Sequence, residues 1–217
     1  MKRILIVDDH QLMREAYKHA IMTLGSFEFG EAGTYQEAHD LVTASRWDIV
    51  ILDVTIPGRN GLDVLAEIRN LPHAPAVLVC SGHDESVYGV RAFKAGAAGY
   101  VCKTAGTGEF LKAVREIVQG NNYISTNLAQ NLAAFVRSDF QEQPHTTLSE
   151  REFQVLRKLI NGDALKEIAA ELNLSSKTVS TYRSRLMEKL KVKSLPELVQ
   201  YCIEHGLMEK TGANVAA

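Results

Sequence analysis

The feature that most constrains the fold is a short, unbroken apolar run that ends in an acid. Residues 49–52 are Ile-Val-Ile-Leu, Asp53 follows them directly, and Pro57 and Gly58 come soon after. Such a run is typical of a strand buried on both faces, as in parallel sheets, and the turn residues mark its end. Asp53 is therefore predicted at the carboxyl edge of a parallel strand, where open α/β sheets bind ligands. Taken alone, the pattern is equally compatible with an acid that only caps the next helix.

Four more segments repeat this order of an apolar strand and a helix. The expected strands cover residues 2–7, 27–32, 76–80 and 99–102, beside the strand at 48–53. The expected helices cover residues 10–25, 35–45, 61–70, 84–95 and 107–119, and in the first of them Leu12, Ala16, Ala20 and Leu24 share helical spacing. This alternation predicts an α/β domain with a doubly wound, five-stranded parallel sheet covered by helices on both faces.

Polar residues stand at the ends of four of these strands. Asp8 and Asp9 follow the first strand, Asp53 the third, Ser81 the fourth and Lys103 the fifth. The carboxyl ends of parallel strands lie on one edge of a doubly wound sheet, so these side chains are expected to converge. Unrelated helix caps would have no reason to coincide in this way.

The expected cluster has the chemistry of a phosphoryl-transfer site. Three carboxylates at one edge repel each other unless a cation intervenes, and Mg²⁺ prefers oxygen ligands that include phosphate. Lys103 adds an ammonium group and Ser81 a hydroxyl, which leaves Asp53 as the nucleophile. The alternative is a structural Lys–Asp pair on a fold that binds something else.

Residues 1–120 resemble the receiver domain of bacterial two-component response regulators, a flavodoxin-like or CheY-like fold. The residues that carry the resemblance are Asp8, Asp9, Asp53, Pro57, Gly58, Gly61, Ser81, Tyr100 and Lys103. The resemblance implies that Asp53 accepts phosphate from a sensor histidine kinase. It also implies that Asp9, Asp53 and the Thr55 carbonyl bind Mg²⁺, with Asp8 acting through water, and that Ser81 and Tyr100 form a switch pair. Thr104 stands where many receivers have proline, which puts a cis bond after Lys103 in doubt because a non-proline cis bond costs about 3 kcal/mol.

The rest of the chain divides into a connector and a helical segment. Residues 121–147 read as a linker, with a probable helix over 125–136 and a polar stretch around Pro144. Residues 148–217 are predicted as an all-α domain of four helices. Six basic residues lie within 175–193 against one acid, Glu188; they are Lys177, Arg183, Arg185, Lys189, Lys191 and Lys193. Two short helices of which the second is basic are typical of a helix-turn-helix, although a basic face can also be merely solvated.

Residues 148–205 resemble the LuxR-type helix-turn-helix of the NarL/FixJ class, in particular BvgA/EvgA-like members. The matching residues are Leu148 to Glu152, Val155, Leu156, Lys166 to Ala169, Leu174, Ser175, Lys177 to Val179, Lys189 and Leu190. The resemblance implies DNA contacts by Lys166, Lys177, Thr178, Ser180, Thr181, Tyr182, Arg183, Ser184 and Lys193. It also implies a two-fold dimer contact through Leu198, Val199 and Cys202 of the last helix.

Composition supports this interpretation of a cytoplasmic, phosphorylation-controlled transcription regulator. The net charge is −2, there are three cysteines with no metal-ligand spacing, and no signal-peptide or membrane-length apolar run is evident. The expected partners are a sensor histidine kinase, promoter DNA and a second copy of the chain, and the only expected catalysis is the receiver's own phosphotransfer and dephosphorylation. Three alternatives stay open: a phosphatase with an aspartyl-phosphate intermediate, an adaptor that never binds DNA, and a receiver that works without phosphorylation.

Overall fold

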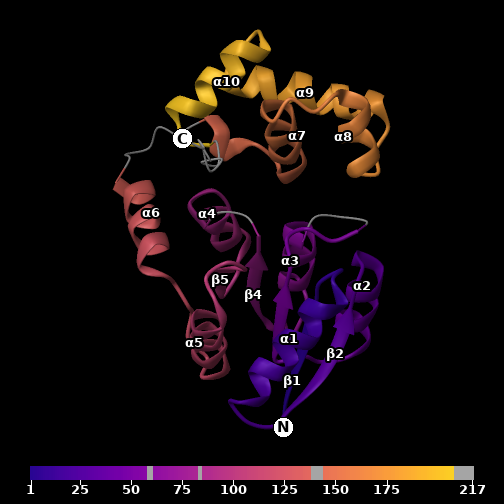
Figure 1. The fold of residues 1–217 in the computed structure, drawn as a ribbon, viewed down its shortest axis with the longest axis vertical. Coiled ribbons are helices and arrows are strands. Elements are labelled where there is room, and N and C mark those ends of the chain that lie inside the picture. The colour runs from indigo at the N-terminus through magenta and orange to yellow at the C-terminus, as the bar shows by residue number, and fades with distance from the viewer. Residues whose placement is uncertain (58–60, 83–84, 138–143, 208–217) are drawn as a thin grey trace, which may run out of the picture. The chain divides into compact units, whose positions relative to one another are not determined.

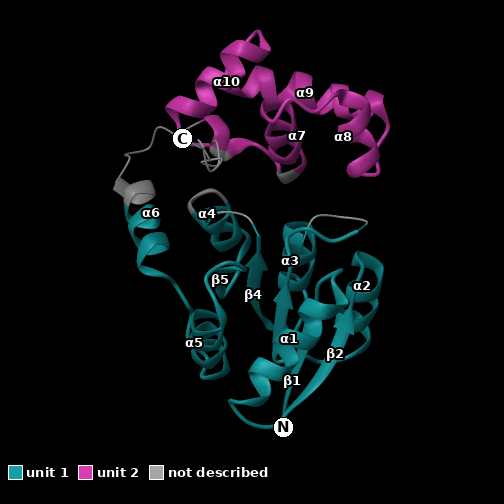
Figure 2. Cartoon of the chain, in the orientation of Figure 1, with its two compact units in different colours: residues 1–139 teal, residues 140–217 magenta. Residues whose placement is uncertain are grey.

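The computed structural model describes residues 1–57, 61–82, 85–137 and 144–207. The chain divides into two compact units, residues 1–139 and 140–217 (Figure 1, Figure 2). Each unit has its own core, so each is described by itself.

The first unit is built on a five-stranded sheet in the order β2-β1-β3-β4-β5. Its strands are β1 (Lys2–Val7), β2 (Phe27–Ala32), β3 (Ile49–Leu52), β4 (Ala76–Ser81) and β5 (Gly99–Cys102). Every neighbouring pair is parallel. The predicted doubly wound parallel sheet is therefore confirmed.

Helices cover both faces of this sheet. The helices are α1 (Gln11–Met22), α2 (Tyr35–Ala44), α3 (Gly61–Arg69), α4 (Glu85–Ala95), α5 (Thr107–Val118) and α6 (Thr126–Arg137). Figure 1 shows α1 and α5 on one face and α2, α3 and α4 on the other. This layering follows from the sequence, because strands that are apolar on both faces need cover on both.

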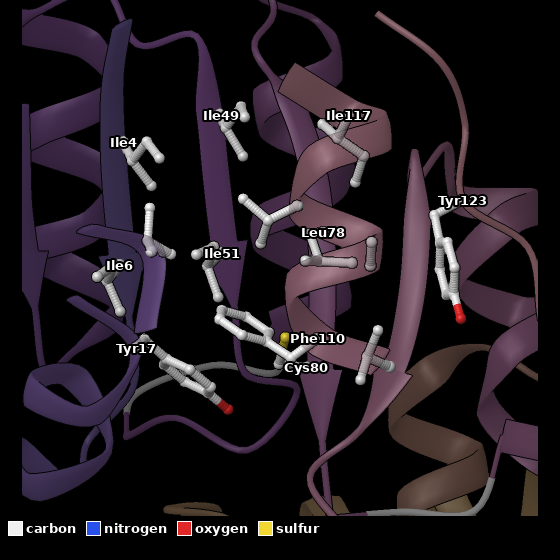
Figure 3. Close-up of a cluster of buried hydrophobic side chains, with 14 residues drawn as sticks. Ile4, Ile6, Tyr17, Ile49, Ile51, Leu78, Cys80, Phe110, Ile117 and Tyr123 are labelled. Atoms are coloured by element: carbon white, nitrogen blue, oxygen red, sulfur yellow. The ribbon is translucent and has the colours of Figure 1, made fainter. Parts of the chain in front are cut away.

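The core between the sheet and the α1–α5 layer is shown in Figure 3. Ile4 and Ile51, from neighbouring strands, are at most 1% exposed. Phe110 of α5 packs against Tyr17 of α1, with ring centroids 4.7 Å apart. Burying each such large side chain stabilises the fold by about 1.5–3 kcal/mol. This core fixes the strand ends that carry the polar residues.

The inward face of α1 differs from the expected one. Leu12 is 82% exposed and Ala16 is also exposed, whereas Tyr17 and Ile21 are buried. Ala20 and Leu24 of the predicted set do pack against the core, so the prediction is wrong only for Leu12 and Ala16, and Tyr17 meets Phe110 instead. Both faces offer apolar residues at helical spacing, and packing against the sheet decides between them.

The segment predicted as a connector contains α6, which packs on α4 within the first unit. Leu128 of α6 is fully buried. A short 3₁₀ helix, Pro144–Thr147, precedes the helices of the second unit. Helical structure thus occupies two parts of residues 121–147.

The second unit contains α7 (Glu150–Ile160), α8 (Leu165–Glu171), α9 (Ser176–Leu190) and α10 (Leu195–Glu204). The predicted all-α domain is confirmed. Ser149 and Glu152 form a capping box at the start of α7, and Ser175 and Ser194 cap α9 and α10. Within the part of the chain that the structure describes, no helix is long and apolar enough to span a membrane.

Candidate functional site

The strand register brings the polar residues to one edge of the sheet. Val7 pairs with Leu52, so Asp8 and Asp53 leave β1 and β3 side by side, and the Asp53 N–H donates to the Val7 carbonyl at 2.8 Å. On the other side of β3, the Lys103 N–H donates to the Ser81 carbonyl at 2.8 Å. The convergence expected from the sequence is therefore present.

Lys103 joins two buried carboxylates at this edge. Its Nζ lies 2.7 Å from Asp8 Oδ2 and 2.8 Å from Asp53 Oδ2. Asp8 and Asp53 are only 1% and 4% exposed. Two carboxylates facing one ammonium group leave an excess of negative charge in a poorly solvated place, which favours the arrival of another cation.

The pKa values at this site reflect both burial and the ion pairs. Burial raises the pKa of Asp53 above its usual value, and the opposing effects of Lys103 and the Thr55 N–H only partly offset it. Burial lowers the pKa of Lys103, but the hydrogen bonds to Asp53 and Asp8 outweigh burial and leave it raised. Lys103 is therefore charged at neutral pH.

Asp53 is further constrained by the loop that follows it. Its Oδ1 accepts a hydrogen bond from the Thr55 N–H at 3.1 Å. The Gly61 N–H donates to the Val54 carbonyl at 2.8 Å, and a Cβ on Gly61 would lie 2.1 Å from the Asp53 carbonyl oxygen. Glycine at position 61 lets α3 begin directly against the backbone of Asp53.

The ligand atoms of Asp8, Asp9 and His10 lie within 4.8 Å of one another. The His10 Nδ1 is 2.7 Å from Asp9 Oδ1 and 3.3 Å from Asp8 Oδ1. Because carboxylates only accept hydrogen bonds, this nitrogen carries the proton. These residues and the net negative charge fit a divalent cation, although Asp53 and Thr55, also expected as ligands, are not in this group. Sequence reasoning missed His10, whose only signal was its place directly after the two acids.

The expected switch residues are both fully buried. Ser81 ends β4 and Tyr100 lies in β5, the neighbouring strand. Burial raises the pKa of the Tyr100 phenol, and a hydrogen bond with Ser81 opposes this effect. The two side chains are thus in contact. The peptide bond after Lys103, where Thr104 replaces proline, is trans.

The residues expected to contact DNA lie on α8, on α9 and just beyond α9. Those that are exposed are Lys166, Lys177, Ser180, Thr181, Ser184 and Lys193, and those that are partly exposed are Thr178, Tyr182 and Arg183. Thr181 Oγ1 donates to the Lys177 carbonyl at 3.0 Å and Ser184 Oγ to the Ser180 carbonyl at 3.1 Å. Their hydroxyl protons are used within the helix, which leaves oxygen lone pairs available to accept hydrogen bonds.

The expected dimer residues occupy different environments. Leu198 and Cys202 are fully buried in the unit's own core, so their side chains are not available to a second chain. Val199 is partly exposed, and Leu195 and Ile203, four residues to either side, are 38% and 57% exposed. Residues four apart share a helix face, so these three form an outward apolar stripe, of which the sequence had predicted only Val199 as a dimer residue.

The Lys103 bridge leads to a stability prediction. Lys103→Met leaves two buried carboxylates without their ammonium partner and should lower the free energy of unfolding at pH 7 by about 3–5 kcal/mol. The pKa of Asp53 then lies further above its unfolded value, so protonation favours the fold and the deficit should shrink toward about pH 4. Urea denaturation at several pH values measures this. Lys112→Met, at an exposed position of α5, is the control, and an equal loss in both variants would contradict the role of the bridge.

Two sequence families match the chain. The response regulator receiver domain matches residues 4–115, and the bacterial regulatory proteins of the luxR family match residues 146–202. The response regulator UvrY of Escherichia coli O6:H1 is 33% identical over 209 residues, which cover 95% of this chain and 96% of UvrY. The response regulator GacA of Pseudomonas aeruginosa is 34% identical over 214 residues, covering 96% and 99%.

Solved structures give the same result. A LuxR-family two-component response regulator from Aurantimonas sp. SI85-9A1 is 34% identical with a TM-score of 0.57, covering 62% of this chain and 96% of that one. RcsB of Salmonella enterica serovar Typhimurium, solved on promoter rprA with the phosphomimetic BeF₃⁻, has a TM-score of 0.62, covers 93% and 98%, and at 20% identity supports the fold alone. The chain belongs to the two-component response regulators in which a receiver domain is followed by a LuxR-type DNA-binding domain.

Proposed function

We propose that Asp53 accepts a phosphoryl group from a phosphohistidine of a sensor histidine kinase, and that the phosphorylated chain regulates transcription as a dimer on promoter DNA. The observation that carries this proposal is the Lys103 ammonium group held between two buried carboxylates at the open edge of the sheet. A site with this charge pattern is suited to bind and neutralise a phosphoryl group.

The phosphotransfer follows from the positions of these groups. A carboxylate oxygen of Asp53 attacks phosphorus, and the phosphorus–nitrogen bond breaks with its electron pair going to the imidazole of the kinase. Lys103 neutralises charge on the phosphoryl oxygens, and Thr55 orients the Asp53 carboxylate through its N–H. Attack of water on the same phosphorus breaks its bond to the Asp53 oxygen, which regenerates the carboxylate and releases phosphate. The catalysis proposed for the receiver is limited to its own phosphorylation and dephosphorylation.

Mg²⁺ is the metal that we assign to this site. Asp9, Asp53 and the Thr55 carbonyl would bind it directly and Asp8 through water, and the bound ion would neutralise charge on the transferred phosphate. The fit rests on the negative charge that Lys103 leaves uncompensated. The Asp9 Oδ1 atom accepts a hydrogen bond from His10, and the second oxygen of the carboxylate would supply the metal ligand.

Transmission of the signal begins at Ser81. The phosphoryl group would draw the Ser81 hydroxyl toward it, which removes the hydrogen bond that Ser81 shares with Tyr100. Tyr100 would then move into the space that Ser81 leaves. A buried pair of this kind gives two discrete arrangements for phosphorylation to select between.

DNA binding rests on α9. Lys177 and Thr181 stand on an exposed face opposite Val179 and Leu186, which are buried. Lys166, Lys177, Thr178, Tyr182 and Lys193 would contact phosphates, while Ser180, Thr181 and Ser184 would face bases. Arg183 would also contact the DNA. Short hydroxyl side chains offer few bidentate base contacts, so part of the specificity is expected to come from DNA shape.

The dimer contact would use the outward stripe of α10, Leu195, Val199 and Ile203. Residues four apart form a ridge that can pack against the same ridge of a second copy about a two-fold axis. Leu198 and Cys202 would support this surface from inside the unit. Such a regulator would work in the cytoplasm, where both the kinase domain of its partner and the promoter DNA are found.

Asp53→Asn should abolish incorporation of phosphate from a small-molecule phosphodonor such as acetyl phosphate, because the amide is not a nucleophile. Mass spectrometry of the intact protein, or a gel that separates the phosphorylated from the unphosphorylated protein, measures the labelling. Asp40→Asn, at an exposed carboxylate of α2, is the matched control and should label normally. Persistent labelling of the Asp53 variant would contradict the assignment of Asp53 as the phosphoacceptor.

Lys177→Ala should weaken binding to all duplexes alike and reduce the slope of log affinity against log salt by about 1, because one phosphate contact is lost. Fluorescence anisotropy over a range of salt concentrations measures the slope. Lys158→Ala is the control, since Lys158 pairs with Asp163 and Glu171. A slope that does not change removes Lys177 from the phosphate contacts.

Ile203→Asp should prevent two chains from binding one duplex together, because it places a charge in the centre of a packed apolar ridge. Folding should be unaffected, since Ile203 is 57% exposed. Analytical ultracentrifugation of the protein–DNA complex gives the stoichiometry. Gln200→Asp adds the same charge outside the stripe and should leave the dimer intact; an intact dimer in both variants would place the contact elsewhere.

A further inference from the structure

The chain returns to the sheet before it leaves the first unit. Tyr123 forms a parallel bridge with Gly99, and its N–H donates to the Ala98 carbonyl at 2.8 Å. The Tyr123 hydroxyl donates to Glu109 Oε1 at 2.9 Å. This anchor lies beside β5, the strand that contains Tyr100.

The start of α6 is then attached to α4 by two contacts. Ser125 Oγ donates to Glu85 Oε2 at 2.6 Å and accepts from the Leu128 N–H at 3.0 Å, so one hydroxyl both caps α6 and binds α4. Leu128, fully buried, lies over Gly89, where a Cβ would come within 2.7 Å of Leu128 Cδ1. Glu85 and Gly89 are four residues apart and therefore share one face of α4. We call this pair of interactions the α4–α6 contact.

The same end of α4 lies next to the switch residues. Helix α4 begins at Glu85, four residues after Ser81 in the chain. Tyr88, one turn further along, is 3% exposed. Helix α4 packs against β5, the strand that contains Tyr100. The helix that packs on the strand of Tyr100 thus also carries, at its first residue, the partner of Ser125.

We infer that the α4–α6 contact is the route by which a change at Ser81 and Tyr100 leaves the first unit. Helix α6 leads, through the chain, to the DNA-binding unit, so a shift of α4 that breaks or rebuilds the contact changes how this connection is held. The inference rests on the proposed phosphorylation of Asp53. It identifies the contact through which that phosphorylation would affect the DNA-binding unit.

The form of the contact makes it sensitive to small movements. A Cβ on Gly89 would lie 2.7 Å from Leu128 Cδ1, so an added carbon forces Leu128 to shift, and tightly packed surfaces do not deform continuously. The Ser125 hydroxyl links the cap of α6 to Glu85, so displacement of Glu85 also weakens the start of α6. A small shift of α4 is therefore expected to release α6 in one step.

The test uses the full chain with two variants that disrupt the contact from opposite sides. Leu128→Ala removes the side chain from α6, and Gly89→Ala pushes against it from α4. Gln130→Ala, at an exposed position of α6, is the control. For each protein, three quantities are measured: labelling of Asp53 by acetyl phosphate with Mg²⁺, hydrogen exchange of α6, and affinity for a duplex that the phosphorylated wild-type protein selects from a random pool, each with and without phosphodonor.

We expect phosphorylation to speed hydrogen exchange of α6 in the wild type and to change DNA affinity by at least about fivefold, the lower end of typical allosteric coupling. In both contact variants Asp53 should still be labelled, α6 should exchange fast without phosphate, and the affinity ratio should fall toward one. The control should keep the wild-type ratio.

Two outcomes overturn the inference, and they are distinguishable. If either contact variant folds, is labelled and keeps the full wild-type ratio, α6 is not the route, while the proposed function stands. If wild-type Asp53 is not labelled, the proposed function fails and the inference fails with it.

Discussion

The structure of the first unit depends on one ammonium group placed between two buried carboxylates. An isolated carboxylate at 1–4% exposure would be strongly destabilising, and Asp8 and Asp53 are tolerated because Lys103 bonds to both. The charges at this site do not balance, since one positive charge faces two negative ones. That imbalance favours a further cation, and in the proposed function this cation supports binding of the phosphoryl group.

Backbone geometry determines how closely the functional residues approach each other. The register of β1 on β3 places Asp8 beside Asp53, and Gly61 allows α3 to start against the Asp53 carbonyl. Gly89 plays the corresponding part on α4, where it admits Leu128. In both places a missing Cβ allows a close approach, to backbone at Gly61 and to the methyl groups of Leu128 at Gly89.

Much of this arrangement could be predicted from the sequence. Apolar runs such as residues 49–52 identify strands buried on both faces, and parallel topology then brings Asp53 and Lys103 to one edge. The sequence is less informative where a helix has apolar residues on two faces, because either face could point toward the core. In α1 both the Leu12 and the Tyr17 phases are apolar, and only the position of Phe110 decides between them. Likewise, Leu198 and Ile203 are both apolar residues of α10, and only the packed unit shows which one faces outward. His10 could not be assigned because its contact depends on side-chain rotamers rather than on spacing.

We propose that Lys103 and a divalent cation together make this edge of the sheet a phosphoryl-binding site. Fluorine NMR of the protein with beryllofluoride, which mimics a phosphoryl group on aspartate, tests this claim most directly. We expect bound fluorine resonances with wild-type protein only when Mg²⁺ is present, and none after removal of the Lys103 ammonium group. Bound resonances of equal intensity in the presence of a chelator, or in the absence of the Lys103 ammonium group, would contradict it.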